Sequence, residues 1–466
     1  MIFHPTRKQR GQEPVLLADK LLKRTVSRCP VCQAACPAEV WRIGGIPAKV
    51  FLKRTCSEHG EATVCIASDA RFYWLAQGRS QNGCSGSACC SSDGSPAGTL
   101  GRNADPGDAI GIQEKLSTCL ALIEIVHSCN LACPTCYADS PVGAGSHVDA
   151  VPLENLKQRI QGVIERKGDI EILQLSGGEP TLHPQFFELL EWLQAHAAIR
   201  YVLLNTNGVR IANDDAFAKT LSRTFRYGRF QLYLQFDGPQ LEGQTFLRGT
   251  DLRRLREQCL DRCAEMNLPV TLAMTVTPEN LPFLWQTIEF GLQRPNVRGV
   301  SFQPIFGSGR VPNPAITSHV SPTRLNTADI ILAAVEQSGG QLRFEDFTPL
   351  PCGDPNCATI GYLLKVGGRV RSISDFIDFT AVQGFLSDKV GYKLEDLMRC
   401  GCESEPLGEL LKRFELNESH TFRLFIKPFM DAWTWDEDRI DRCCTHVIRP
   451  DGKLDSFCRY YSGVKT

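Results

Sequence analysis

The chain has 466 residues and a formal net charge of −1, so it is long enough to bury several cores and carries no overall basic field. This charge balance excludes the long-range attraction on which nucleic-acid binding depends, and nucleic acid is not an expected partner. Cysteine is the compositional outlier with 21 residues, an odd number that argues against a fully paired disulfide framework and favours metal binding.

Residues 1–12 are polar and basic, no apolar signal segment follows them, and no apolar run is long enough to span a bilayer. We therefore expect a cytoplasmic protein, with any membrane association arising through its substrate. In a reducing compartment, clustered thiols serve metals more often than disulfides.

The N-terminal region, residues 1–84, combines short strand-like runs with two cysteine-bearing turns, CPVC and CSEHG. Ligands contributed by two separate turns suit tetrahedral metal coordination. The four candidate ligands are Cys29, Cys32, Cys56 and His59. The pattern therefore predicts a rubredoxin-like or zinc-ribbon domain with a mononuclear iron or zinc site, in which Cys65 or a linker cysteine is an alternative fourth ligand.

Residues 85–118 are rich in Gly, Ser and Pro, which predicts a linker. Three cysteines lie in or beside it: Cys84, Cys89 and Cys90. Two interpretations stay open, because these thiols could be ligands of a further cluster or free surface thiols.

Short apolar runs alternate with helical patterns over residues 119–340. The candidate strands are residues 121–126, 170–175, 200–205, 230–236, 270–276 and 299–303. The candidate helices are residues 153–166, 184–197, 252–266 and 281–292. Strands that alternate with helices pair in parallel through right-handed crossovers, so we predict an α/β fold, a partial (β/α)6 barrel of the TIM type. A doubly wound open sheet is the structural alternative.

Three cysteines follow the first candidate strand with the spacing C-x3-C-x2-C: Cys129, Cys133 and Cys136. They fall at the carboxyl end of a strand, where parallel α/β folds build their active sites. Three thiolates can hold three corners of a 4Fe-4S cubane and leave the fourth iron open to another ligand. A zinc site completed by His127 or a distant cysteine is the alternative.

The second candidate strand ends in the motif SGGEP, which contains Gly177, Gly178 and Glu179. Paired glycines allow a ligand to approach the backbone closely, and the glutamate places a carboxylate beside them. An ordinary strand-to-helix turn explains these residues equally well when the motif stands alone.

Taken together, the two motifs resemble those of the radical S-adenosylmethionine (SAM) enzymes. The resemblance implies that Cys129, Cys133 and Cys136 hold a 4Fe-4S cluster, that SAM chelates its open iron, and that reductive cleavage yields a 5′-deoxyadenosyl radical. It also implies that residues 177–179 contact the SAM amino group. Thr135 is a departure, because most members have an aromatic residue directly before the third cysteine.

Later strand ends supply further candidates for SAM contacts: Asn205, Gln235 and Asp237. These polar side chains follow the third and fourth strands and are expected at the same barrel mouth. Asn207-Gly208 and Asp237-Gly238 are also favourable turn dipeptides, so a purely structural interpretation stays open.

The C-terminal region, residues 341–466, carries further cysteines in the segments PCGDPNC, DRCCTH and FC. Thiols from such distant segments could close a four-thiolate auxiliary cluster. Cys119, in an apolar pattern, is interpreted instead as a buried core thiol. An aromatic cluster, which would favour a lipid substrate if it lines the cavity, comprises Phe425, Phe429, Trp433 and Trp435.

Over nearly the whole chain, the motifs resemble a narrower group, the tetraether lipid synthase and pterin-dimethyltransferase-like radical SAM family. The shared motifs include CPVC with CSEHG, HSCNLACPTCY, LSGGEPT, PCGDPNC and RPDGKLDSFC. The resemblance implies additional 4Fe-4S clusters beside the mononuclear metal site and a long-chain lipid substrate. The best matches to auxiliary ligands are Cys352, Cys357, Cys443 and Cys458, with Cys444 as a competing neighbour. We also expect an electron donor such as flavodoxin or ferredoxin.

Two enzymatic functions are compatible with these features. In the first, the radical abstracts hydrogen from an unactivated carbon for C–C bond formation on a lipid chain. In the second, SAM also supplies methyl groups to a small molecule such as a pterin, and a peptide-modifying maturase is a further alternative. The non-enzyme alternative is a metal-ribbon protein or electron carrier that no longer cleaves SAM. No side chain is assigned as a catalytic acid or base, because the cofactor carries the chemistry.

Overall fold

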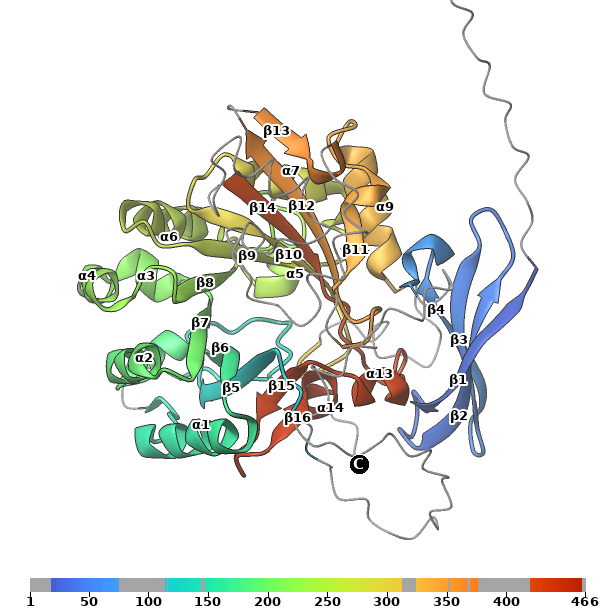
Figure 1. Cartoon of the computed structure of the whole chain (residues 1–466), viewed down its shortest axis with the longest axis horizontal. Coiled ribbons are helices and arrows are strands. Elements are labelled where there is room, and N and C mark those ends of the chain that lie inside the picture. Colours follow the sequence, from blue (N-terminus) through green and yellow to red (C-terminus); the bar gives the residue numbers. More distant parts are fainter. Residues whose placement is uncertain are drawn as a thin grey trace, which may run out of the picture.

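The computed structural model of the chain describes residues 18–74, 114, 116–143, 147–311, 324–350, 353–366, 369–375 and 420–462. The candidate linker ligands Cys84, Cys89 and Cys90, and the candidate auxiliary ligand Cys352, lie outside these residues. Figure 1 shows a small four-stranded sheet beside a larger α/β part.

The small sheet consists of four antiparallel strands in sequence order. They are β1 (Lys20–Arg28), β2 (Ala35–Ile43), β3 (Lys49–Cys56) and β4 (Gly60–Ala67). Burial alternates along β3, so one face packs on a core that includes Val40, Val50 and Leu52. The turn between β1 and β2 and the turn between β3 and β4 lie at the same end of the sheet, which brings CPVC next to CSEHG.

Six parallel strands form the centre of the larger part, each hydrogen-bonded to the next. They are β5 (Leu120–Val126), β6 (Ile170–Gly177), β7 (Ile199–Thr206), β8 (Phe230–Gln235), β9 (Val270–Val276) and β10 (Val297–Pro304). All six predicted strands are therefore present. The sheet does not close on itself, so the predicted partial barrel is confirmed.

Most helices lie on the outer side of this sheet (Figure 1). The helices of this part are α1 (Leu153–Lys167), α2 (Phe186–Ala195), α3 (Val209–Asn213), α4 (Asp215–Thr224), α5 (Gln244–Arg248), α6 (Arg253–Glu265), α7 (Leu284–Leu292) and α9 (Thr327–Gln337). In α1, Leu156, Ile160 and Val163 recur at helical spacing and are fully buried in the main core. Within the described ranges, no helix is long and apolar enough to cross a membrane.

The C-terminal region extends both edges of the six-stranded sheet. Its elements are β11 (Phe347–Pro349), β12 (Thr359–Val366), β13 (Arg369–Ser372), β14 (Thr421–Ile426), α13 (Glu437–Asp441), β15 (Thr445–Ile448), β16 (Leu454–Ser456) and α14 (Phe457–Tyr461). Strand β14 pairs in parallel with β10, and β15 pairs in parallel with β5. These strands therefore continue the barrel sheet across the expected domain boundary at residue 340.

Side chains of the small sheet hold it against the C-terminal region. The Arg54 guanidinium donates to the carbonyl oxygens of Ala432 at 2.7 Å and Trp433 at 2.5 Å, and it lies over the Trp433 ring. Lys23 forms an ion pair with Asp436 at 2.6 Å. Because Arg54 is 2% exposed, its bonds are shielded from water and fix the position of the small sheet.

Candidate functional site

A cavity of about 750 Å³ lies inside the partial barrel. Its wall comes from the inner faces of β5 to β10, from the loop after β5, and from β12, β14 and α14 of the C-terminal region. A cavity of this size suits a ligand of cofactor dimensions. The described cysteines expected for the two iron-sulfur sites all line it: Cys129, Cys133, Cys136, Cys357, Cys443 and Cys458.

Backbone hydrogen bonds fix the loop that carries the first three of these cysteines. The Cys129 amide donates to the Pro141 carbonyl at 2.9 Å, and the Cys129 carbonyl accepts from the Gly143 amide at 2.9 Å. Cys136 and Arg310 exchange two backbone bonds of 2.9 Å, which tie the loop to the segment after β10. The loop therefore presents its thiols to the cavity from a rigid frame.

The electrostatics of these thiols fit a metal cluster. Burial raises the pKa of Cys129 to about 12 and raises the pKa of Cys133, although the Arg248 guanidinium opposes the shift at Cys133. Buried thiols with raised pKa values become thiolates only when a nearby cation compensates the charge. A cluster bound by Cys129, Cys133 and Cys136 would supply that charge, so the residues present fit the expected group.

The two glycines of the SGGEP motif pack against the start of this loop. Gly177 has φ +121°, and a Cβ atom there would lie 2.0 Å from the Val126 carbonyl oxygen. A Cβ atom at Gly178 would lie 2.0 Å from the Ser128 carbonyl oxygen. Both glycines line the cavity. The end of β6 therefore approaches the loop with Cys129, Cys133 and Cys136, here called the cluster loop, as closely as the backbone allows.

Glu179 also lines the cavity, and its carboxylate is 1% exposed. It accepts four hydrogen bonds from the chain: from the Thr181 amide at 3.2 Å and hydroxyl at 2.7 Å, from the Thr206 hydroxyl at 2.7 Å and from the Asn207 amide at 2.8 Å. Burial nevertheless raises its pKa. These bonds join the ends of β6 and β7, so Glu179 sets the shape of the cavity mouth.

The remaining SAM candidates divide into two groups. Asn205 and Gln235 line the cavity, and the Asn205 amide donates to the Ser176 hydroxyl at 3.2 Å. Asp237 is 1% exposed and instead forms a buried ion pair with Arg248 at 2.6 Å. Arg248 therefore lines the cavity and Asp237 lies behind it, and a contact between Asp237 and SAM stays a prediction.

The auxiliary cysteines lie in the C-terminal region and line the same cavity as the cluster loop. Burial raises the pKa of Cys357 to about 11 and that of Cys458 to about 12. Cys444 lines the cavity together with Cys443, and burial raises its pKa to about 12 as well. All described members of the expected set thus line one cavity, and the competing neighbour Cys444 lines it too. Cys119, expected as a core thiol, also lines the cavity and is disulfide-bonded.

The polar inner wall of the barrel has no counterpart among the residues expected from the sequence. Side chains at alternating positions of β6 to β10 line the cavity: Gln174, Tyr201, Gln231, Tyr233, Thr271, Ser301 and Gln303. These strands carry a polar residue at every second position and are otherwise apolar. Strands buried on both faces usually lack such residues, so this alternation was the signal for a polar cavity wall.

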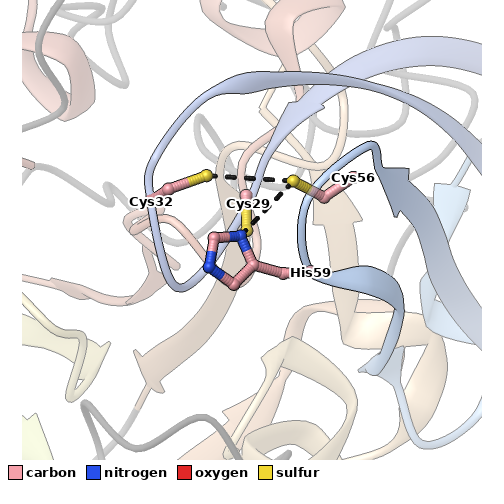
Figure 2. Close-up of side chains that lie close together, drawn as sticks. All are labelled: Cys29, Cys32, Cys56 and His59. Atoms are coloured by element: carbon pink, nitrogen blue, oxygen red, sulfur yellow. Dashed lines mark hydrogen bonds between the residues drawn. The ribbon is translucent and has the colours of Figure 1, made fainter.

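The four candidate ligands of the N-terminal site converge from the two turns, as Figure 2 shows. Their ligand atoms, from Cys29, Cys32, Cys56 and His59, all lie within 4.8 Å of one another. The Cys32 and Cys56 Sγ atoms are 3.8 Å apart, and Cys56 Sγ lies 3.7 Å from His59 Nδ1. Zinc–sulfur bonds of about 2.3 Å give a tetrahedron with edges of about 3.8 Å, so the four residues fit a tetrahedral metal ion.

Comparison with known proteins gives two family matches. Residues 123–291 match the radical SAM superfamily, and residues 21–68 match the HMPTM N-terminal zinc ribbon domain. The 7,8-dihydro-6-hydroxymethylpterin dimethyltransferase of Methanocaldococcus jannaschii is 26% identical over 94% of this chain and 93% of its own length. Mycofactocin maturase MftC of Mycobacterium tuberculosis is 26% identical over 34% of this chain and 38% of its own length.

A solved structure of native anSMEcpe with bound AdoMet and the Kp18Cys peptide aligns with a TM-score of 0.35 and 17% identity, covering 60% of this chain and 86% of that one.

The family matches coincide with the two parts described above, the partial barrel and the small metal-binding sheet. Residues 123–291 therefore form a radical SAM domain, of the superfamily that uses a 4Fe-4S cluster and SAM, and residues 21–68 match a zinc ribbon.

Proposed function

We propose that this radical SAM enzyme transfers methyl groups from SAM to a small polar heterocycle of the pterin class. The observation that carries the proposal is the polar inner wall of the cavity. The Tyr201 hydroxyl donates to the Gln231 amide oxygen at 3.1 Å, and the Gln231 amide nitrogen donates to Thr271 at 2.5 Å. The Tyr233 hydroxyl donates to Ser301 at 2.6 Å.

The Gln231 amide and the Thr271 and Ser301 hydroxyls can each form further hydrogen bonds, and all three residues line the cavity. A heterocycle with several ring nitrogens and an exocyclic amine can replace the water that solvates them. An alkyl chain in the same place would remove that water without replacing its hydrogen bonds, which costs free energy for each polar group left unpaired. The similarity to the pterin dimethyltransferase over 94% of the chain supports the same substrate class.

In this proposal, Cys129, Cys133 and Cys136 hold the 4Fe-4S cluster, which when bound supplies the electron that cleaves SAM. Asn205 and Gln235 lie on the cavity wall and would orient the SAM molecule. The C-terminal strands extend both edges of the sheet, and β12 and β14 contribute residues to the cavity wall. We propose a flavodoxin or ferredoxin as electron donor.

A second candidate is the coupling of alkyl chains, and a specific part of the cavity favours it. The aromatic residues of this part are Phe306, Phe425, Phe429 and Phe457. The rings of Phe429 and Phe457 stack at 4.1 Å. Trp433 and Trp435, grouped with them in the sequence, are instead buried in packing cores. Lipid coupling stays a prediction that rests on this aromatic wall and on the family resemblance.

One experiment distinguishes the two candidates. The protein is reconstituted anaerobically with iron and sulfide and given SAM, reductant, and either 7,8-dihydro-6-hydroxymethylpterin or a phospholipid extract. Pterin-dependent formation of both S-adenosylhomocysteine and 5′-deoxyadenosine supports methyl transfer. Lipid-dependent 5′-deoxyadenosine without S-adenosylhomocysteine contradicts it and supports coupling.

A further inference from the structure

Gln174 lies near the middle of β6 and lines the cavity. It pairs in register with Leu122 of β5 and Leu203 of β7, and both leucines also line the cavity. Side chains that lie directly opposite each other on neighbouring strands share one face of a sheet. The register therefore places the Gln174 side chain on the inner face of the barrel, between two apolar neighbours.

This side chain lacks a partner in the protein. Gln174 is 9% exposed, and no hydrogen bond joins its carboxamide to another residue that the structure describes. Both polar atoms of the amide keep some accessible surface, and the space that the side chain borders is the cavity. Because a buried polar group costs free energy unless it is paired, the contents of the cavity must supply the hydrogen-bond partners of Gln174.

The other carboxamides on the described part of the cavity wall are engaged by the chain. Each of them hydrogen-bonds to another side chain: Asn205, Asn207, Gln231, Gln235 and Gln303. The Glu179 carboxylate is engaged as well, because it accepts four hydrogen bonds. Among the carboxamides of the described wall, Gln174 is therefore the one whose whole hydrogen-bonding capacity is left for a ligand.

Gln174 lies deeper in the barrel than the residues expected to contact SAM. Two residues further along β6, the Ser176 hydroxyl lies 3.1 Å from the Tyr137 hydroxyl and accepts from the Asn205 amide at 3.2 Å. Tyr137 directly follows the third cysteine of the cluster loop. Residues two apart on one face of a strand are separated by about 6.6 Å. With SAM at the level of Asn205, Gln174 borders the deeper space, which the substrate occupies in the proposed function.

We infer that Gln174 selects the substrate by its lactam edge, the ring N–H group that adjoins a ring carbonyl. A carboxamide presents a donor and an acceptor side by side, so it can form two parallel hydrogen bonds with an edge that offers one of each. A pterin carries such an edge on its pyrimidinone ring, whereas an alkyl chain would leave the amide unpaired. The inference rests on the proposed function and adds to it the residue that recognises the heterocycle.

Binding measurements test this role without requiring turnover. The reconstituted protein, with SAM and without reductant, would be titrated anaerobically by calorimetry with 7,8-dihydro-6-hydroxymethylpterin. A second titration would use the corresponding pteridine, which lacks the amino and oxo groups of the pyrimidinone ring. We expect the wild type to bind the pterin at least about tenfold more tightly, because a site built to hydrogen-bond a polar group rejects analogues that lack it.

Gln174→Met approximately keeps the size of the side chain and removes both hydrogen-bonding groups. We expect it to weaken pterin binding about tenfold and to leave pteridine binding unchanged, since the lost bonds form only with the pterin. Because the amide has no described protein partner, methionine between two leucines should not lower the free energy of unfolding measured in urea. A merely structural role would give the opposite result, lower stability with unchanged selectivity.

Gln286→Met, at an exposed position of α7, is the matched control and should bind both molecules as the wild type does. Unchanged pterin affinity in Gln174→Met, or weaker binding of SAM in its place, would overturn the inference alone. Equal binding of the two molecules by the wild type would overturn it as well. Pterin selectivity that depends on Gln174, without formation of S-adenosylhomocysteine when reductant is added, would contradict the proposed function alone.

Discussion

The buried ion pair of Asp237 provides a sharp test of how the cavity wall is held. The Asp237 carboxylate accepts from Arg248 Nε at 2.6 Å and Nη2 at 3.0 Å, and from the Thr275 amide at 3.0 Å. Arg256 lies 3.6 Å away and is fully buried. Burial alone would raise the pKa of Asp237, but the two arginines hold it below its ordinary value. The carboxylate is therefore the shared counter-charge of two buried cations.

Asp237→Asn keeps the size of this side chain and removes its charge. Removal of one partner from a buried ion pair costs about 3–5 kcal/mol, because the remaining charge stays buried without compensation. We expect the free energy of unfolding to fall by about 3 kcal/mol. This value is the lower end of that range, because the asparagine amide oxygen can still accept hydrogen bonds. Urea unfolding under anaerobic conditions, followed by tryptophan fluorescence, measures the change.

Asp251→Asn is the matched control, since Asp251 pairs with Arg253 at 2.7 Å on the surface and both side chains are at least a third exposed. An exposed pair contributes about 0–1 kcal/mol, so this variant should unfold almost as the wild type does. The double variant Asp237→Asn/Arg248→Met should recover part of the lost stability. A loss below about 1 kcal/mol in Asp237→Asn would mean that the buried pair behaves like a surface pair, against this prediction.

Three further predictions concern the cysteines, the glycine motif and a buried lysine. Cys133→Ala should abolish formation of 5′-deoxyadenosine, whereas Cys357→Ala should retain uncoupled SAM cleavage and lose product, as mass spectrometry of both nucleosides would show; loss of cleavage in both variants would contradict separate roles. Gly178→Ala should lower stability by about 1–3 kcal/mol and displace the cluster loop, because its Cβ atom would lie 2.0 Å from the Ser128 carbonyl oxygen; wild-type urea unfolding and iron content would contradict this. Burial lowers the pKa of Lys365 to about 8, so its charged form costs stability below that pH and the cost disappears as the pH rises toward the unfolded-state value. Lys365→Met should therefore stabilise the protein by about 1 kcal/mol near pH 7 and have little effect near pH 11; an equal effect at both pH values would exclude titration as the cause.

The strands and the cysteine loop could be predicted because their signals are local. Apolar runs of strand length recur between helical patterns, and the candidate strand at 200–205 appears as Ile199–Thr206. Parallel pairing then places every carboxyl end at one edge, which explains why the C-x3-C-x2-C loop and the GGEP turn meet at one cavity.

The partners of Asp237 could not be predicted in this way. An Asp-Gly pair after a strand is typical both of a ligand-binding turn and of a structural one. Its role depends on Arg248 and Arg256, which come from α5 and α6 and approach only after the helices have packed. Sequence spacing carries no signal for such a contact, so the sequence alone leaves both roles of Asp237 open.

The pairing of the C-terminal strands also lacks a local signal, and it determines how the enzyme is built. Strand β14 joins β10 on one edge of the sheet, while β15 joins β5 on the opposite edge, although the two strands are near each other in sequence. The chain from β14 to β15 therefore crosses the open side of the partial barrel and carries Cys443 and Cys444 with it. Residues of this crossing segment, among them Phe429, Cys443 and Cys444, line the same cavity as the cysteines of the cluster loop. A group held by those thiols would thus border the same cavity as the cluster loop, and strand β14 contributes Phe425 to the wall of that cavity.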